Sequence, residues 1–183
     1  MVSSSQSHSP ALALETTMIQ NALAGDACFV FQMGSSEQAL ESFTEAVEAR
    51  FSECNFRLEG SATARGTATL GDFSVALSKL DPSRVTVSEG LKIPAGWVTV
   101  GDIPRFSIRL VTSTGEKLID AKTERIESDQ SPQVERHKTS ELNIRVRDEK
   151  SAAKIADAFR RAIMLCGGGN PVPSSGTTPK TAR

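Results

Sequence analysis

The sequence has few of the side chains that most catalytic and metal sites require. Its 183 residues include two histidines, one tryptophan, no tyrosine and three cysteines, Cys28, Cys54 and Cys166. The cysteines form no CxxC pair, so the ligand spacing of a zinc site is missing. Neither a phosphate-binding glycine loop nor a nucleophile elbow is present. We therefore expect a protein that is not an enzyme and that holds no metal or cofactor.

Long apolar runs and an excess of one charge are also missing. No stretch approaches the roughly 18 apolar residues of a membrane-spanning helix. The first residues, MVSSSQSHSP, lack the basic and apolar regions of a signal peptide. We expect a soluble chain that is cytoplasmic by default, or exported if a signal was removed from it. A formal net charge of −1 gives no overall attraction to nucleic acid.

The two ends of the chain are polar and carry no apolar periodicity. Ser dominates the first ten residues, and the last fourteen, NPVPSSGTTPKTAR, are rich in Pro, Ser and Thr. Such segments are typical of disorder. We therefore expect disorder at 1–10 and 169–183, a helical N-terminal segment at 11–53 and a β-rich domain at 54–168.

Helical spacing occurs twice near the front of the chain. Residues 11–24 place Leu14, Met18 and Ala22 at helical intervals. Residues 36–52 give the stronger pattern, because Ser35 and Gln38 match a capping box. The apolar face of this second predicted helix comprises Leu40, Phe43, Val47 and Phe51.

From Asn55 onward, apolar and polar residues alternate with the period of a strand. About seven short runs follow one another with brief turns, which favours an antiparallel meander. Thr114-Gly115 predicts a hairpin, 128–133 a polar loop, and 139–146 the last strand. The fold class expected is α+β.

A final amphipathic helix is predicted over 149–166. Asp148 can cap its first amides, and the glycines at 167–169 can end it. Ile155, Phe159 and Ile163 lie on one face, so we expect this face to pack on the sheet.

The order of these elements resembles the pleckstrin-homology-like fold, in particular a group of bacterial domains of that kind. The resemblance covers 54–168 and includes the turn LDPSRVTV, the strand SELNIRV and the helix end AIMLCGG. It implies an antiparallel open β-barrel of about seven strands, built from two nearly orthogonal sheets and closed by the C-terminal helix. Lipid-binding members carry Lys and Arg in the first hairpin loop, but GSATARG has only Arg65. We therefore expect no specific inositol-phosphate binding.

The same resemblance brings Cys54 and Cys166 into view as a possible disulfide. In such a barrel the end of the closing helix can lie near the first strand, so these two cysteines would approach each other. The alternative is three buried or semi-buried thiols, because no export signal is visible and disulfides need an oxidising compartment.

One basic cluster is a weak candidate for an anion site. Arg136, His137 and Lys138 are consecutive, and Lys122 lies on the preceding predicted strand. The alternative for all four is a solvated hairpin face. As a general base, His137 would need a carboxylate partner, and we expect Glu135 to point to the opposite face of the strand.

Two functions remain open at this point. The first is a non-catalytic module that binds an unknown protein or peptide at a sheet edge or a groove beside the helix. The second is a barrel that holds a small molecule or lipid in its interior. A filled interior would favour the first, and an internal cavity the second.

Overall fold

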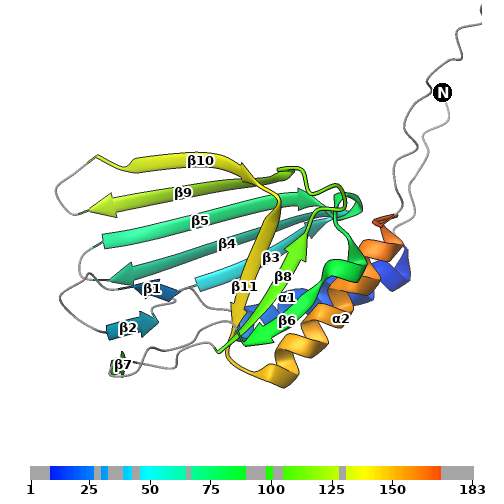
Figure 1. Ribbon diagram of the computed structural model, residues 1–183, viewed down its shortest axis with the longest axis horizontal. Coiled ribbons are helices and arrows are strands. Elements are labelled where there is room, and N and C mark those ends of the chain that lie inside the picture. The colour runs from blue at the N-terminus through cyan, green and yellow to red at the C-terminus, as the bar shows by residue number, and fades with distance from the viewer. Residues whose placement is uncertain are drawn as a thin grey trace, which may run out of the picture.

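The computed structural model describes residues 9–26, 30–32, 39–42, 46–64, 67–89, 98–100, 105–127 and 131–169. The fold is α+β (Figure 1). Its helices are α1 (Pro10–Asp26) and α2 (Glu149–Leu165), with short 3-10 turns η1 (Leu77–Lys79) and η2 (Pro82–Arg84). Its strands are β1 (Val30–Gln32), β2 (Ala39–Ser42), β3 (Ala46–Ser52), β4 (Asn55–Ala64), β5 (Thr67–Ala76), β6 (Thr86–Glu89), β7 (Val98–Val100), β8 (Phe106–Val111), β9 (Ile119–Glu127), β10 (Gln133–Thr139) and β11 (Glu141–Val146).

Two antiparallel sheets carry most of the described strands. One has five strands in the order β10-β9-β5-β4-β3, and the other has three in the order β11-β8-β6. A small third sheet joins β1 to β2 antiparallel and β2 to β7 parallel. Figure 1 shows the strands of the β11-β8-β6 sheet running steeply across those of the five-stranded sheet. Within the described ranges the two large sheets stay separate ladders, so no closed barrel is formed.

The strand order is not the meander that the sequence predicts. The chain passes between the two large sheets from β5 to β6, from β8 to β9 and from β10 to β11. Thr114-Gly115 is indeed a turn, with Gly115 at φ +75°, but the strands on its two sides belong to different sheets. A turn signal fixes where the chain reverses and says nothing about which strands then pair.

The helix predicted over 36–52 is wrong. Its described residues form β2 and β3, and β3 pairs with β4 along its whole length, from Ala46↔Ser61 to Ser52↔Asn55. Val47, Ala49 and Phe51 also alternate with the period of a strand, and the ladder decides between the two patterns. The capping box at Ser35 and Gln38 lies outside the described residues.

Two helix predictions are confirmed, with one change of face. In α1 the buried side chains are Thr16, Ile19 and Leu23, whereas Leu14 is 70% exposed. In α2 the predicted face is buried completely, and the Asp148 carboxylate accepts a hydrogen bond from the Ser151 amide at 2.6 Å. After α2, the Gly168 amide donates to the Ile163 carbonyl at 2.8 Å, which is the predicted glycine-rich helix end.

One hydrophobic core joins both helices to the two large sheets. Phe159 of α2 is fully buried against Phe56, with ring centroids 5.1 Å apart, and lies 6.4 Å from Phe51. Ile19 and Leu23 of α1 belong to the same buried cluster. The helix α1 is therefore packed on the β-rich part through this shared core.

The sequence places 135–138 on a solvated hairpin strand without giving that strand its bounds. The structure shows the strand as β10, in which Gln133–Thr139 pairs with β9 in full register. All but the last of its seven residues are exposed, so no apolar alternation marks the strand. Periodicity reports burial on one face, and an exposed edge strand has no buried face.

Candidate functional site

The face of the five-stranded sheet that turns away from α2 is covered with charged side chains. Residues directly opposite one another on paired strands lie on the same face of a sheet. The register therefore aligns two rows across the five strands. The first row is Arg50, Arg57, Ser74, Asp120 and Lys138, and the second row is Glu48, Glu59, Asp72, Lys122 and Arg136. We call these ten residues the charged face.

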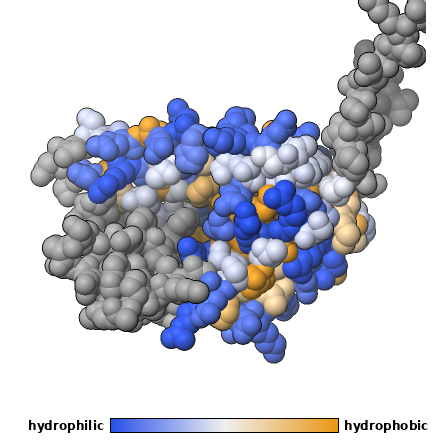
Figure 2. All heavy atoms as spheres, in the orientation of Figure 1, coloured by the Kyte–Doolittle hydropathy of each residue, from blue (hydrophilic) through white to orange (hydrophobic). Residues whose placement is uncertain are grey.

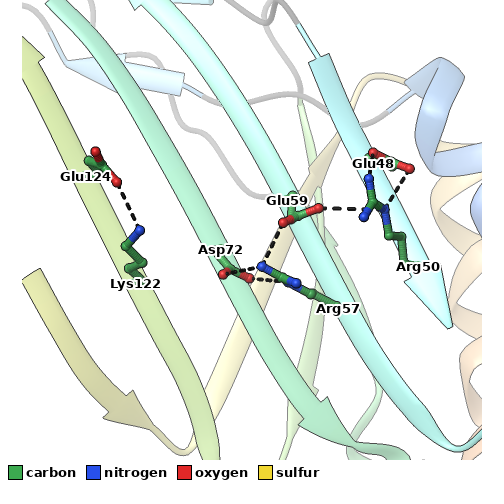
Figure 3. Close-up of polar contacts among 7 residues, drawn as sticks. All are labelled: Glu48, Arg50, Arg57, Glu59, Asp72, Lys122 and Glu124. Carbon is green, nitrogen blue, oxygen red and sulfur yellow. Dashed lines mark hydrogen bonds and ion pairs between the residues drawn. The ribbon is translucent and has the colours of Figure 1, made fainter. Parts of the chain in front are cut away.

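Ion pairs connect neighbouring strands on the charged face (Figure 3). Arg57 binds Asp72 through two hydrogen bonds of 2.8 Å and also lies 2.8 Å from Glu59. Arg50 binds Glu48 through hydrogen bonds of 2.8 and 2.7 Å, with Glu59 at 3.7 Å. The guanidinium groups of β3 and β4 are thus held in fixed planes by carboxylates of the second row.

These contacts change the protonation equilibria in the expected directions. The hydrogen bond from Arg50 is the main cause that lowers the pKa of Glu48. Hydrogen bonding to Glu48 raises the pKa of Arg50, and hydrogen bonding to Asp72 raises the pKa of Arg57. The pairs are exposed, so each adds little to stability. Their effect is to orient the two guanidinium groups.

A groove of about 650 Å³ opens at one end of the charged face, beside η1. It is lined by Arg50, Phe51, Ser52, Asn55, Phe56, Arg57, Ser74, Val75, Ala76, Lys79, Leu118 and Asp120. A second hollow of about 300 Å³ lies over the acidic part of the second row, including Glu48, Glu59 and Asp72. Both hollows open to solvent. The second lies on the charged face, whereas the lining of the first also includes Phe51, Phe56 and Val75 of the opposite face.

The two edges of the five-stranded sheet differ. The β3 edge is covered by α1, and the Gln20 side-chain amide donates to the Ala49 carbonyl at 3.0 Å. The β10 edge has no neighbouring strand among the described residues. Figure 2 shows mostly hydrophilic side chains along β10. An edge strand with free amide and carbonyl groups is a template for pairing with another chain.

The predicted anion patch is divided by the sheet. Lys122, Arg136 and Lys138 lie on the charged face, whereas His137 stands opposite Ala121 on the other face. Lys122 is paired with Glu124 at 2.9 Å, and Lys138 with Asp120 at 3.1 Å. Within the described ranges Arg136 has no carboxylate partner. The four residues therefore do not converge on one anion.

His137 and Glu135 lie on the same face of β10, contrary to the expectation from sequence. They are two residues apart, so the pleat turns both side chains the same way. The His137 Nδ1 atom lies 3.9 Å from the Glu135 Oε1 atom, and both side chains are largely exposed. No nucleophile is bound to this pair among the described residues, which fits a solvated strand.

The structure joins Cys54 to Cys166 by a disulfide whose Cα atoms are 5.7 Å apart. Cys54 lies in the turn between β3 and β4, and Cys166 follows the last residue of α2. The bridge ties the end of the closing helix to the sheet turn, at the place where the resemblance put the two cysteines. Cys28 and Arg65 lie outside the described residues.

Sequence reasoning missed the arginines of the charged face. Arg50 was placed on a helix, so nothing brought it beside Arg57. A usable signal was present at 56–59, where Phe56 and Leu58 alternate with Arg57 and Glu59. That pattern predicts charged side chains on one sheet face, but only the register shows which of them meet.

Comparison with models of known families, with curated proteins and with solved structures finds no match for this chain. Among the described residues, no helix is both long and apolar enough to span a membrane. The same residues contain no group of three or more His, Cys, Asp or Glu side chains arranged to hold a metal ion.

Proposed function

We propose that this protein is a non-catalytic interaction module that binds an extended peptide along the β10 edge. The observation that carries the proposal is the contrast between the two sheet edges. α1 covers β3, while β10 offers seven paired residues with nearly every side chain exposed. Strand addition gives affinity through main-chain hydrogen bonds and selectivity through alternate side chains.

The charges of β10 favour an acidic peptide. On the charged face, an added strand would lie beside Arg136 and Lys138, and Lys138 keeps 61% of its side chain exposed. Opposite charges on neighbouring strands stabilise pairing by about 0.2–1 kcal/mol each. A peptide with Glu or Asp at alternate positions would meet both cations.

The same charges disfavour pairing between two copies of the chain. In-register antiparallel pairing of β10 with itself would place Arg136 against Arg136 at its centre. Like charges directly opposite each other destabilise a sheet. The arrangement therefore supports a different partner, and a dimer through β10 is an outcome that would count against the proposal.

The alternative of a ligand inside the fold has less support. The inner sheet faces carry buried side chains such as Phe56, Leu58 and Ile108, and Phe159 of α2 is buried with them. The two hollows described above are open to solvent and not enclosed inside the fold. A pleckstrin-homology-like ancestry would be compatible with either kind of binding, since fold does not fix function.

The test uses two fluorescent peptides and their binding to the full chain. One alternates Glu with Thr, and the other alternates Lys with Thr. We expect the acidic peptide to bind with a Kd below about 1 mM and the basic one at least about tenfold more weakly. Arg136→Glu should reverse this order of affinities. Lys154→Glu, at an exposed position of α2, makes the same change of net charge and should leave the order unchanged.

Proline at Val134 and at Glu135 locates the bound strand. Consecutive amides of a strand point to opposite sides, so one of these two points outward and the other toward β9. The outward proline should keep the fold and abolish peptide binding, because proline is tolerated on an open edge. Binding that survives both prolines, or no binding of either peptide, would refute the proposal.

A further inference from the structure

The groove beside η1 combines three cations with uncommitted donors and an apolar wall. Arg50, Arg57 and Lys79 line it against the single carboxylate of Asp120. Asp120 is itself paired with Lys138 at 3.1 Å. The two arginines are likewise paired, with Glu48, Glu59 and Asp72, so Lys79 is the cation of the lining that has no carboxylate partner among the described residues.

The two arginines are held in position with part of each group unused. Their contacts with described residues run through Nε and Nη2, to Glu48 for Arg50 and to Asp72 and Glu59 for Arg57. The Nη1 atom of each guanidinium has no hydrogen bond or ion pair to another described residue among these contacts. Since carboxylates already fix both planes, a ligand that uses Nη1 loses little conformational entropy in ordering them.

Counting donors and acceptors defines the ligand. Lys79 is exposed and has no ion-pair partner in the described ranges, and an ammonium offers three donors. Ser52, Asn55 and Ser74 also line the groove without a side-chain hydrogen bond to the described residues. These hydroxyl and amide groups can donate or accept, whereas Lys79 and the two Nη1 atoms can only donate. An acceptor-rich group such as a carboxylate or phosphate satisfies those donors best.

The rest of the wall is apolar. Ala76 and Leu118 line the same groove and are half-buried. Binding pockets for small molecules combine such walls with a few placed polar groups. We propose that the groove binds a small molecule with a carboxylate or phosphate head on an apolar body.

The experiment compares four ligands that share one body: octanoate, octyl phosphate, octanol and octylammonium. Titration calorimetry on the full chain should show saturable binding of the two anions below about 1 mM, with octanol and octylammonium at least about tenfold weaker. The two anions distinguish the head groups. A preference for either one supports the site and names its class.

Lys79→Gln and Asn55→Ala test the location. Lys79→Gln should weaken anion binding about five- to tenfold, and Lys154→Gln, which removes an exposed lysine that is not part of the groove lining, should not. Arg136→Glu should leave anion binding unchanged, which separates this proposal from peptide binding at β10.

Several results would overturn the groove site. Equal binding of octylammonium or octanol would show that the cations do not select the ligand. Acetate or inorganic phosphate binding as tightly as the octyl compounds would remove the role of the apolar wall. Unchanged affinity in both groove variants, binding only to anionic vesicles, or no saturation by about 1 mM would each reject it.

Discussion

Phe159 is the largest fully buried side chain of α2. It is fully buried, and its ring meets that of Phe56 edge-on while Phe51 lies beyond. These three rings connect the closing helix to the strands β3 and β4. Aromatic pairs of this kind add about 0.5–1.5 kcal/mol beyond the burial of their area.

We expect Phe159→Ala to lower the free energy of unfolding by about 3–5 kcal/mol, because it leaves a cavity among rings that cannot collapse to fill it. Urea unfolding followed by circular dichroism measures the change. Met164→Ala on the same helix is the control. Met164 is 57% exposed, so its loss should stay within about 0.5 kcal/mol. Equal effects of the two substitutions would contradict this account of the core.

At the scale of elements, the closing helix was predictable and strand partners were not. α2 has a capping Asp148, one apolar face and terminal glycines, and these local features all agree. The segment 46–52 satisfies a helical and a strand pattern at once, and pairing with β4 selects the strand. For β10 no periodic signal exists, because water covers both of its faces.

The pairing of β8 with β11 carries a pH-dependent contact. Arg109 Nε donates to Glu141 Oε2 at 2.9 Å, and this hydrogen bond is the main cause that lowers the pKa of Glu141 below 4.5. A lowered pKa in the folded state means that the contact stabilises the fold above about pH 4.5. That contribution is lost as the pH falls through the lowered value.

We therefore expect Glu141→Gln to reduce the free energy of unfolding by less than about 1 kcal/mol near neutral pH, since both side chains are partly exposed. The difference from the unsubstituted protein should disappear when urea unfolding is repeated well below pH 4.5. Glu89→Gln, on the exposed end of β6, is the matched control. A difference that persists in acid would show that Glu141 acts by packing and not by charge.

At the scale of the whole molecule, the bridge between Cys54 and Cys166 closes most of the fold into one loop. It spans a separation of 112 residues, and loop-entropy models give a bridge of that length roughly 4–5 kcal/mol. The backbone at Gly168 also packs closely on its neighbours, because a Cβ there would meet the Leu80 carbonyl oxygen at 2.8 Å. The bridge ties the end of α2 to the turn between β3 and β4, and Gly168 lets that end pack beside η1.

Two measurements test the bridge. Cys54→Ser with Cys166→Ser should lower the free energy of unfolding by up to about 4–5 kcal/mol, with Cys28→Ser as the control. Of the three cysteines, two are joined in the structure, so one thiol should react after denaturation of protein from its native compartment. Three reactive thiols would show that the two cysteines are packed together in the reduced form.

The sequence by itself determined the α+β class, the closing helix with its caps, and most of the strands that face the core. These depend on local propensity and on burial of one face, which residue order records directly. Only the tertiary structure decided that the chain alternates between the two large sheets, and that α1 covers one edge of the five-stranded sheet while β10 stays open. It also decided that Arg50 of β3 lies directly opposite Arg57 of β4. Such features depend on the register of strands far apart in the chain, and many registers satisfy the same alternation.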